Sequence, residues 1–199
     1  MCIRDSYIGT QATKLNFVNQ ASKAKVLHLA THGKANDEVG DYAFLAFTNL
    51  QNTTDFKLYN RELYNLDLDV EMVALSACET GIGELKKGEG IISLARGFSY
   101  AGAKSIITTL WRVNGTQTQE LMQKFYKNLK NGQTKSKALR MVKINFITNH
   151  PQAANPFFWA AFVPIGDMQS INFVSYNCWR YLILVGFIIM ALVLLRRLR

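Results

Sequence analysis

Residues 26–33 read Val-Leu-His-Leu-Ala-Thr-His-Gly, and residues 72–81 read Met-Val-Ala-Leu-Ser-Ala-Cys-Glu-Thr-Gly. Each stretch begins as a short apolar run without polar alternation, which is typical of parallel strands covered on both faces. Each run leads into a residue with reactive chemistry, His32 in the first and Cys78 in the second. Catalytic groups gather beyond the carboxyl ends of parallel strands, so these two residues are expected at one sheet edge if the strands are neighbours.

Strand and helix patterns alternate along the rest of the chain. Further strands are predicted at Ser105–Trp111 and at Ala160–Ile165, the second on a sheet edge because Pro164 cannot donate a ladder hydrogen bond. Gly102 and Gly132 stand where helices would end. The pattern predicts an α/β sandwich around a mostly parallel sheet. Helical spacing of apolar residues is found in Gly90–Ala101, Glu120–Leu129 and Ser136–Ile147.

The segment of residues 34–68 lacks this pattern and is interpreted as an insertion between two strands of the sheet. Within it, Tyr42–Phe47 is predicted as a short strand and Asn49–Asp55 as a polar turn. Asn60 is predicted to cap a short helix.

The composition indicates one folded domain of ordinary size with a short appendage. The chain has 199 residues, of which 49% are hydrophobic and 19% charged, so it can bury a core. The net charge of +9 suggests a nucleic-acid partner, but four of the 23 basic residues flank one apolar segment. The other lysines are scattered, so a solvated basic surface is favoured and no nucleic-acid partner is predicted. The flanking residues are Arg180, Arg196, Arg197 and Arg199.

The three cysteines are judged as separate thiols. Cys2, Cys78 and Cys178 are far apart in sequence, and no Cys/His cluster has metal-ligand spacing. No disulfide framework, metal site or cofactor is therefore expected. Cys178 is interpreted as a packing or interfacial thiol rather than a palmitoylation site.

The C-terminal segment is predicted to be a membrane anchor. Tyr181–Leu195 is fifteen residues without charge or proline, which as a helix spans roughly 22 Å against a hydrocarbon core of about 30 Å. A buried core helix is the alternative. Interfacial aromatic residues, including Trp179, and arginines able to snorkel at both ends favour the membrane. Residues 179–199 are therefore interpreted as an anchor with a basic tail, joined by a linker of residues 168–178.

His32 and Cys78 would supply a base and a nucleophile. A free thiol with a pKa near ~8.5 is mostly protonated at neutral pH, and a nearby imidazole could favour the thiolate and later protonate a leaving amine. The backbone N–H groups of Gly33 and Cys78 are candidate oxyanion donors. Spacing alone leaves plainer interpretations open, namely a cysteine packed inertly and a histidine in a turn. His28 is predicted as a hydrogen-bonded core histidine and His150 as a surface residue.

Eight short blocks follow one another in the order Leu27–Gly33, Leu75–Gly81, Gly88–Gly90, Leu94–Phe98, Ala101–Ala103, Leu110–Val113, Pro156–Phe162 and Ile165–Asp167. Together they resemble the CHAT-domain family, which are caspase-like peptidases often fused to tetratricopeptide repeats. The resemblance covers about residues 9–167. It implies the three-layer sandwich of the caspase, gingipain and separase type, with His32 and Cys78 matching the catalytic pair.

Two features depart from the family pattern. The family's domain normally begins well before Gly9, so the sequence is interpreted as a partial domain with residues 1–8 as a truncated or non-native lead-in. The missing part would also supply any tetratricopeptide repeats. After Trp111, Val113 and Asn114 the family usually carries Asp, where this chain has Gly115. That change removes a carboxylate near a helix start, which affects capping or substrate recognition.

These observations predict a membrane-anchored cysteine endopeptidase that cleaves a protein or peptide through a thioester acyl-enzyme. The alternative is a non-catalytic, membrane-tethered signalling or scaffolding module with the same fold. The predicted partners are the substrate, the membrane through residues 181–195, and tetratricopeptide repeats. The arginine tail favours a cytoplasmic C-terminus, which leaves two topologies open, an exported domain or a tail-anchored cytoplasmic one.

Overall fold

The computed structural model describes residues 5–34, 40–50, 55–76, 89–111 and 115–173. Its main sheet has four strands in the order β1 (Val26–Leu29), β5 (Met72–Leu75), β6 (Ser105–Thr109) and β7 (Phe162–Gly166). The first three are parallel and β7 is antiparallel at an edge. The predictions of a mostly parallel sheet and of an edge strand containing Pro164 are confirmed.

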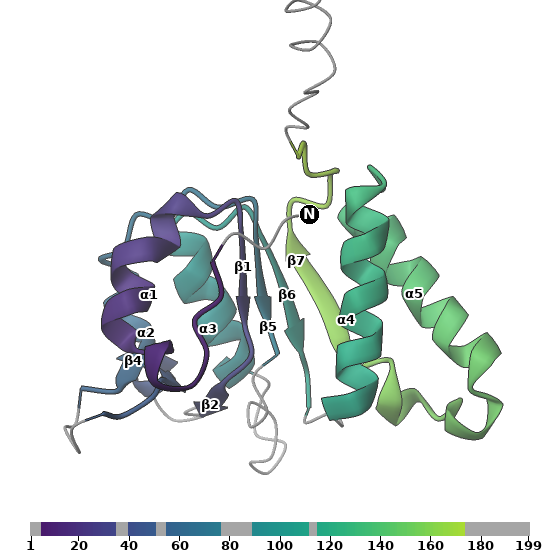
Figure 1. The fold of residues 1–199 in the computed structure, drawn as a ribbon, viewed down its shortest axis with the longest axis horizontal. Helices are drawn as coiled ribbons and strands as arrows, with labels where there is room; N and C mark the ends of the chain where they lie inside the picture. Colours follow the sequence, from purple (N-terminus) through teal and green to yellow (C-terminus); the bar gives the residue numbers. More distant parts are fainter. Residues whose placement is uncertain (1–4, 35–39, 51–54, 77–88, 112–114, 174–199) are drawn as a thin grey trace, which may run out of the picture.

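Helices cover both faces of this sheet and give the predicted three layers (Figure 1). One face carries α1 (Lys14–Gln20) and α3 (Glu89–Tyr100), and the other carries α4 (Gly115–Lys130) and α5 (Lys135–Asn149). The three predicted helices are confirmed, with α4 starting five residues earlier than its apolar spacing indicated. Gly102 and Gly132 follow α3 and α4 with φ of 98° and 78°, the left-handed conformation that ends helices.

The alternating side chains of the central strands divide between two apolar clusters. On β5, Val73 and Leu75 belong to the cluster around Phe98 of α3. Met72 and Ala74 belong to the cluster around Phe125 of α4. Successive side chains of a strand point to opposite faces, so this strand contributes to both cores at once.

β1 is less covered than the sequence predicted. Within the described part of the chain it stands at one edge of the sheet, its apolar residues are only partly buried, and His28 is exposed. The prediction that this strand is covered on both faces, with His28 in the core, is therefore wrong. An apolar run shows that a strand can be buried, but it does not show what lies beside the strand.

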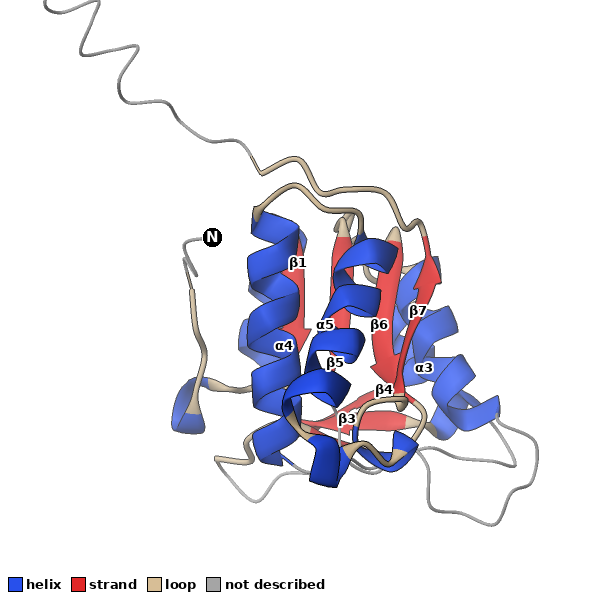
Figure 2. Ribbon diagram, turned by 90° about the vertical axis from the view of Figure 1, so that its right-hand side faces the viewer, coloured by secondary structure: helices blue, strands red, loops and turns tan. Residues whose placement is uncertain are grey.

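The insertion between β1 and β5 forms a second, antiparallel sheet. Its strands are β2 (His32–Lys34), β3 (Phe44–Ala46) and β4 (Lys57–Tyr59), in that order. Figure 2 shows β3 and β4 running across the carboxyl ends of the parallel strands of the main sheet. The strand predicted within Tyr42–Phe47 is confirmed as β3, whereas part of the predicted polar turn at Asn49–Asp55 lies outside the described residues.

The short helix α2 (Asn60–Leu63) follows β4. Its cap differs from the prediction, since Asn60 is the first helical residue and is 1% exposed. The Tyr59 amide instead donates to Oε2 of Glu62 at 2.8 Å, which satisfies a donor at the helix start. The prediction of Asn60 as the cap is therefore wrong, because this residue is used in packing.

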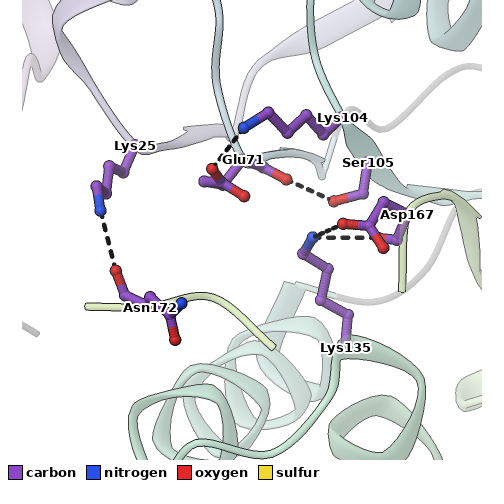
Figure 3. A network of polar contacts seen from close by, with 7 residues as sticks. All are labelled: Lys25, Glu71, Lys104, Ser105, Lys135, Asp167 and Asn172. Atoms are coloured by element: carbon purple, nitrogen blue, oxygen red, sulfur yellow. Dashed lines mark hydrogen bonds and ion pairs between the residues drawn. The ribbon is translucent and has the colours of Figure 1, made fainter. Parts of the chain in front are cut away.

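Polar contacts connect the segments at the amino ends of the parallel strands, on the side of the main sheet away from β3 and β4 (Figure 3). Lys104 Nζ lies 2.7 Å from Glu71 Oε1, and the Ser105 hydroxyl donates to the Glu71 carbonyl at 2.7 Å. The fully buried Lys135 donates to the Asp167 carbonyl at 3.1 Å, with Oδ2 of the same residue 3.7 Å away. The candidate active site lies at the other side, at the carboxyl ends of the parallel strands.

Residues 168–173 are the described part of the predicted linker. Ile171 is 3% exposed and packs in the cluster between the sheet and α4, and Lys25 Nζ donates to the Asn172 carbonyl at 2.9 Å. No helix among the described residues has the length and apolar character needed to cross a membrane. The predicted anchor at residues 179–199 lies outside those residues.

Candidate active site

The site is built where β1 and β5 end side by side. Leu29 and Leu75 are partners in the parallel register, and the Ser76 amide donates to the Leu29 carbonyl at 2.9 Å. The prediction that the two reactive stretches form neighbouring parallel strands is confirmed. Ser76 stands two positions before Cys78, which itself lies outside the described residues.

His32 is held at this edge by the second sheet. It is the first residue of β2, pairs with Ala46 of β3, and is exposed. The preceding Thr31 donates its hydroxyl to the Ala46 carbonyl. Gly33, the predicted oxyanion donor, is buried within β2 opposite Leu45. His32 is therefore a strand residue with an accessible side chain, rather than part of a free turn.

A pocket of about 420 Å³ opens beside His32. Its walls come from the β1–β2 segment, from the residue that follows β5, and from the first two turns of α4. Most of the lining surface is apolar. Among the described residues that line it, none is Asp, Glu, Lys or Arg. They are His28, Ala30, Thr31, His32, Ser76, Gly115, Thr118, Gln119 and Met122.

His28 connects three elements at the base of this pocket. Its Nδ1 shares a hydrogen bond with the Tyr126 hydroxyl at 2.8 Å, and its Nε2 shares one with Ser76 Oγ at 3.0 Å. The ring is reached from the pocket, yet the surrounding protein lowers its pKa by desolvation and favours the neutral form. The predicted hydrogen bonding is confirmed. Burial also raises the pKa of Tyr126 far above its ordinary value, so that its hydroxyl stays protonated.

Sequence reasoning missed Tyr126 as a member of the site. It follows Phe125 of the core stripe, and its spacing carries no functional signal. His150 lies outside the pocket and is partly exposed, as predicted for a surface residue. Its Nε2 is 3.1 Å from Glu120, whose pKa is lowered by Lys124 and then by His150.

Gly115 is the first residue of α4, and the first turn of that helix contains no acidic residue. The position where the chain departs from the expected Asp therefore falls at a helix start, as predicted. An added Cβ at Gly115 would meet no atom within 4 Å, so a side chain at this position has open space.

The mostly parallel sheet, with helices on both faces and a histidine and a pocket at the carboxyl ends of its parallel strands, defines an α/β domain of three layers. Residues 4–167 match the CHAT domain, and the chain therefore belongs to the CHAT-domain family. Tetratricopeptide repeat protein 28 of Mus musculus is 23% identical over 203 aligned positions, covering 83% of this chain. The protein of the same name from Homo sapiens is 28% identical over 111 positions, covering 56%. The aligned regions span only 8% and 4% of the lengths of those two relatives.

Proposed function

We propose that this chain is a cysteine endopeptidase with Cys78 as nucleophile and His32 as general base and acid. The observation that carries the proposal is the pairing of β1 with β5, since the chain leaves these adjacent ends toward His32 and toward Cys78. A pocket lined by both His32 and Ser76 supports a substrate-binding role for this edge.

The chemistry proceeds in two steps. His32 takes the proton of the Cys78 thiol as the sulfur attacks the scissile carbonyl carbon, and it gives this proton to the amine as the C–N bond breaks. The resulting thioester is attacked by water, from which His32 takes a proton, and the carboxylic acid and free thiol are released. In this proposal the N–H groups of Gly33 and Cys78 stabilise the oxyanion of each tetrahedral intermediate. No metal or organic cofactor takes part in these steps.

Cleavage of a peptide library by variants of the full chain tests this proposal. Cys78→Ala is expected to abolish cleavage, and His32→Gln to lower kcat/KM by about 10²–10⁴-fold, the usual contribution of a general acid–base. Cys178→Ala is the matched control and should cleave as the wild type does. Circular dichroism should be unchanged in all three. Cleavage that survives in Cys78→Ala would remove this residue from the mechanism.

The second candidate is a non-catalytic module that binds partners through the same fold. Its support is that the curated relatives are named for tetratricopeptide repeats and align with this chain over a small part of their length. A peptide carrying a thiol-reactive group separates the candidates. A peptidase should react selectively at Cys78 in a His32-dependent way, whereas a scaffold should show no such preference. In either case, repeats in the same or another chain are proposed as partners.

We further propose that residues 179–199 tether the domain to a membrane. The support is the uncharged apolar run Tyr181–Leu195 between arginines. Ile188→Arg is expected to reduce co-sedimentation of the full chain with lipid vesicles, and unchanged binding would contradict the tether. Protease protection of the domain in intact cells then decides between the two topologies.

A further inference from the structure

We propose that the pocket beside His32 receives one uncharged, apolar side chain of the substrate, and that this contact selects the peptide to be cleaved. The inference rests on the proposed peptidase function and adds to it the class of substrate.

The described residues that line the pocket favour an uncharged occupant. No lysine, arginine or carboxylate is present among them, and desolvation favours the neutral form of His28. Glu120 follows the lining residue Gln119 on α4, but its carboxylate is paired with Lys124 and His150. A charged substrate side chain entering the pocket would lose hydration without gaining an opposite charge from these described residues.

The lining of the pocket favours an apolar side chain, and its size gives such a side chain ample room. Its volume of about 420 Å³ lies within the ~300–1,000 Å³ range of ligand pockets. Ala30 and Met122 contribute apolar wall, and Met122 is 4% exposed. Methionine is unbranched and polarisable, so it adapts to side chains of different shape. Methionine, leucine or phenylalanine in the substrate would fit this description.

Binding can be read at the pocket itself by NMR of methyl-labelled methionines in the full chain. N-acetyl-methioninamide is expected to shift the Met122 methyl signal, and the aspartic acid and arginine derivatives are expected to bind at least about tenfold more weakly, because each would bury an unpaired charge. Met141 on α5 is the internal control, because it is 41% exposed and does not line the pocket. Failure of the methionine derivative to shift Met122, or equal binding by the charged derivatives, would overturn the inference.

A pair of variants at Gly115 tests the charge argument. Gly115 is one of the residues that line the pocket, and an added side chain has open space there. Gly115→Asp therefore introduces a carboxylate at a lining position, and Gly115→Asn a neutral group of the same shape. The Asp variant is expected to bind the arginine derivative at least tenfold more tightly than the wild type, and the Asn variant to match the wild type. Equal affinity of the two variants for the arginine derivative would contradict the inference that the charge of the lining residues decides which side chain binds.

The same samples distinguish failure of the inference from failure of the peptidase proposal. Iodoacetamide has no amino-acid side chain, so its reaction with Cys78 reports on the thiol and not on the pocket. Selective Met122 shifts without His32-dependent alkylation would support an apolar pocket and contradict the peptidase. The reverse result would support the peptidase and overturn the apolar specificity.

Discussion

At the scale of single residues, His28 links the strand end that precedes Cys78 to α4. Both of its ring nitrogens are hydrogen-bonded, to Ser76 and to Tyr126, and desolvation lowers the pKa of the ring, which favours its neutral form. A protonated ring would have to donate from both nitrogens while carrying a desolvated charge. The contacts of His28 around the pocket therefore favour the neutral form of its imidazole over the protonated form.

The lowered pKa of His28 predicts that the free energy of unfolding falls on mild acidification. The folded-state pKa of His28 lies below the ordinary value of 6.5, so the unfolded chain binds more protons below that pH. The stabilisation is complete above pH 6.5 and is lost as the pH falls through the lowered folded value. Urea unfolding at pH 7.5, 6.5 and 5.5 should show this decline.

The control for the pH experiment is His28→Gln, which cannot be protonated in this range. Its free energy of unfolding should change less between pH 7.5 and 5.5 than that of the wild type. The carboxylate of Glu120, whose pKa is lowered from 4.5, acts only at more acidic pH and does not confuse the comparison. An identical decline in both proteins would show that another group is responsible.

The sequence predicts most about residues that combine reactive chemistry with a strand end. His32 lies at the predicted side of the sheet because the chain that leaves a parallel strand emerges at its carboxyl end. His28 was placed in the core because apolar neighbours suggested burial, but the edge position of β1 depends on which strands pair. Tyr126 is 98 positions from His28, and no local pattern reports such a contact.

At the scale of elements, close packing of α3 on α2 depends on Gly97. A Cβ added at Gly97 would lie 2.0 Å from Oδ1 of Asn60 and 3.0 Å from Leu63 Cδ1. Both neighbours are fully buried, so neither can move away freely. Gly97→Ala is expected to destabilise the fold by about 1–3 kcal/mol through overpacking, measured by urea denaturation.

Gly115→Ala is the matched control for this prediction. It is also a helical glycine, but its added Cβ has nothing within 4 Å. The change should be neutral or stabilising by up to about 1 kcal/mol, because alanine restricts the unfolded chain more than glycine does. If the two alanine variants were equally stable, the contact between α2 and α3 would be looser than the Gly97 distances indicate.

The helices α3, α4 and α5 could be predicted from the helical spacing of their apolar residues, and the main strands from their apolar runs. Of the second sheet only β3 could be predicted, since each of its strands has three residues and its pairing depends on contacts distant in sequence. The same limit applies to α1, whose seven residues contain one buried apolar side chain, Phe17. The conformation of such short elements is stabilised mainly by packing against the rest of the domain.

At the scale of the whole molecule, the two ends of the parallel strands have different roles. The polar contacts of Figure 3 lie where these strands begin, and the pocket and His32 lie where they end. Lys135 is the buried member of these polar contacts, with its charge directed at Asp167. This pair holds the end of β7 to the start of α5.

The Lys135–Asp167 pair predicts unequal effects of removing its two partners. Asp167→Asn leaves a buried ammonium without its opposite charge and should cost about 1–3 kcal/mol in the free energy of unfolding. Lys135→Met replaces the buried charge by an apolar side chain of similar length and should cost less. Urea unfolding of the two variants and of the double variant measures the difference. A larger loss for Lys135→Met would contradict this account.

The central claim is that His32 activates the Cys78 sulfur across the adjacent ends of β1 and β5. The most direct measurement is the rate of Cys78 alkylation by iodoacetamide as a function of pH, followed by mass spectrometry with Cys178 as internal reference. In the wild type the rate should rise with a midpoint below the ~8.5 of a free thiol, and in His32→Gln the midpoint should return to about that value. Superimposable profiles for the two proteins would contradict the claim.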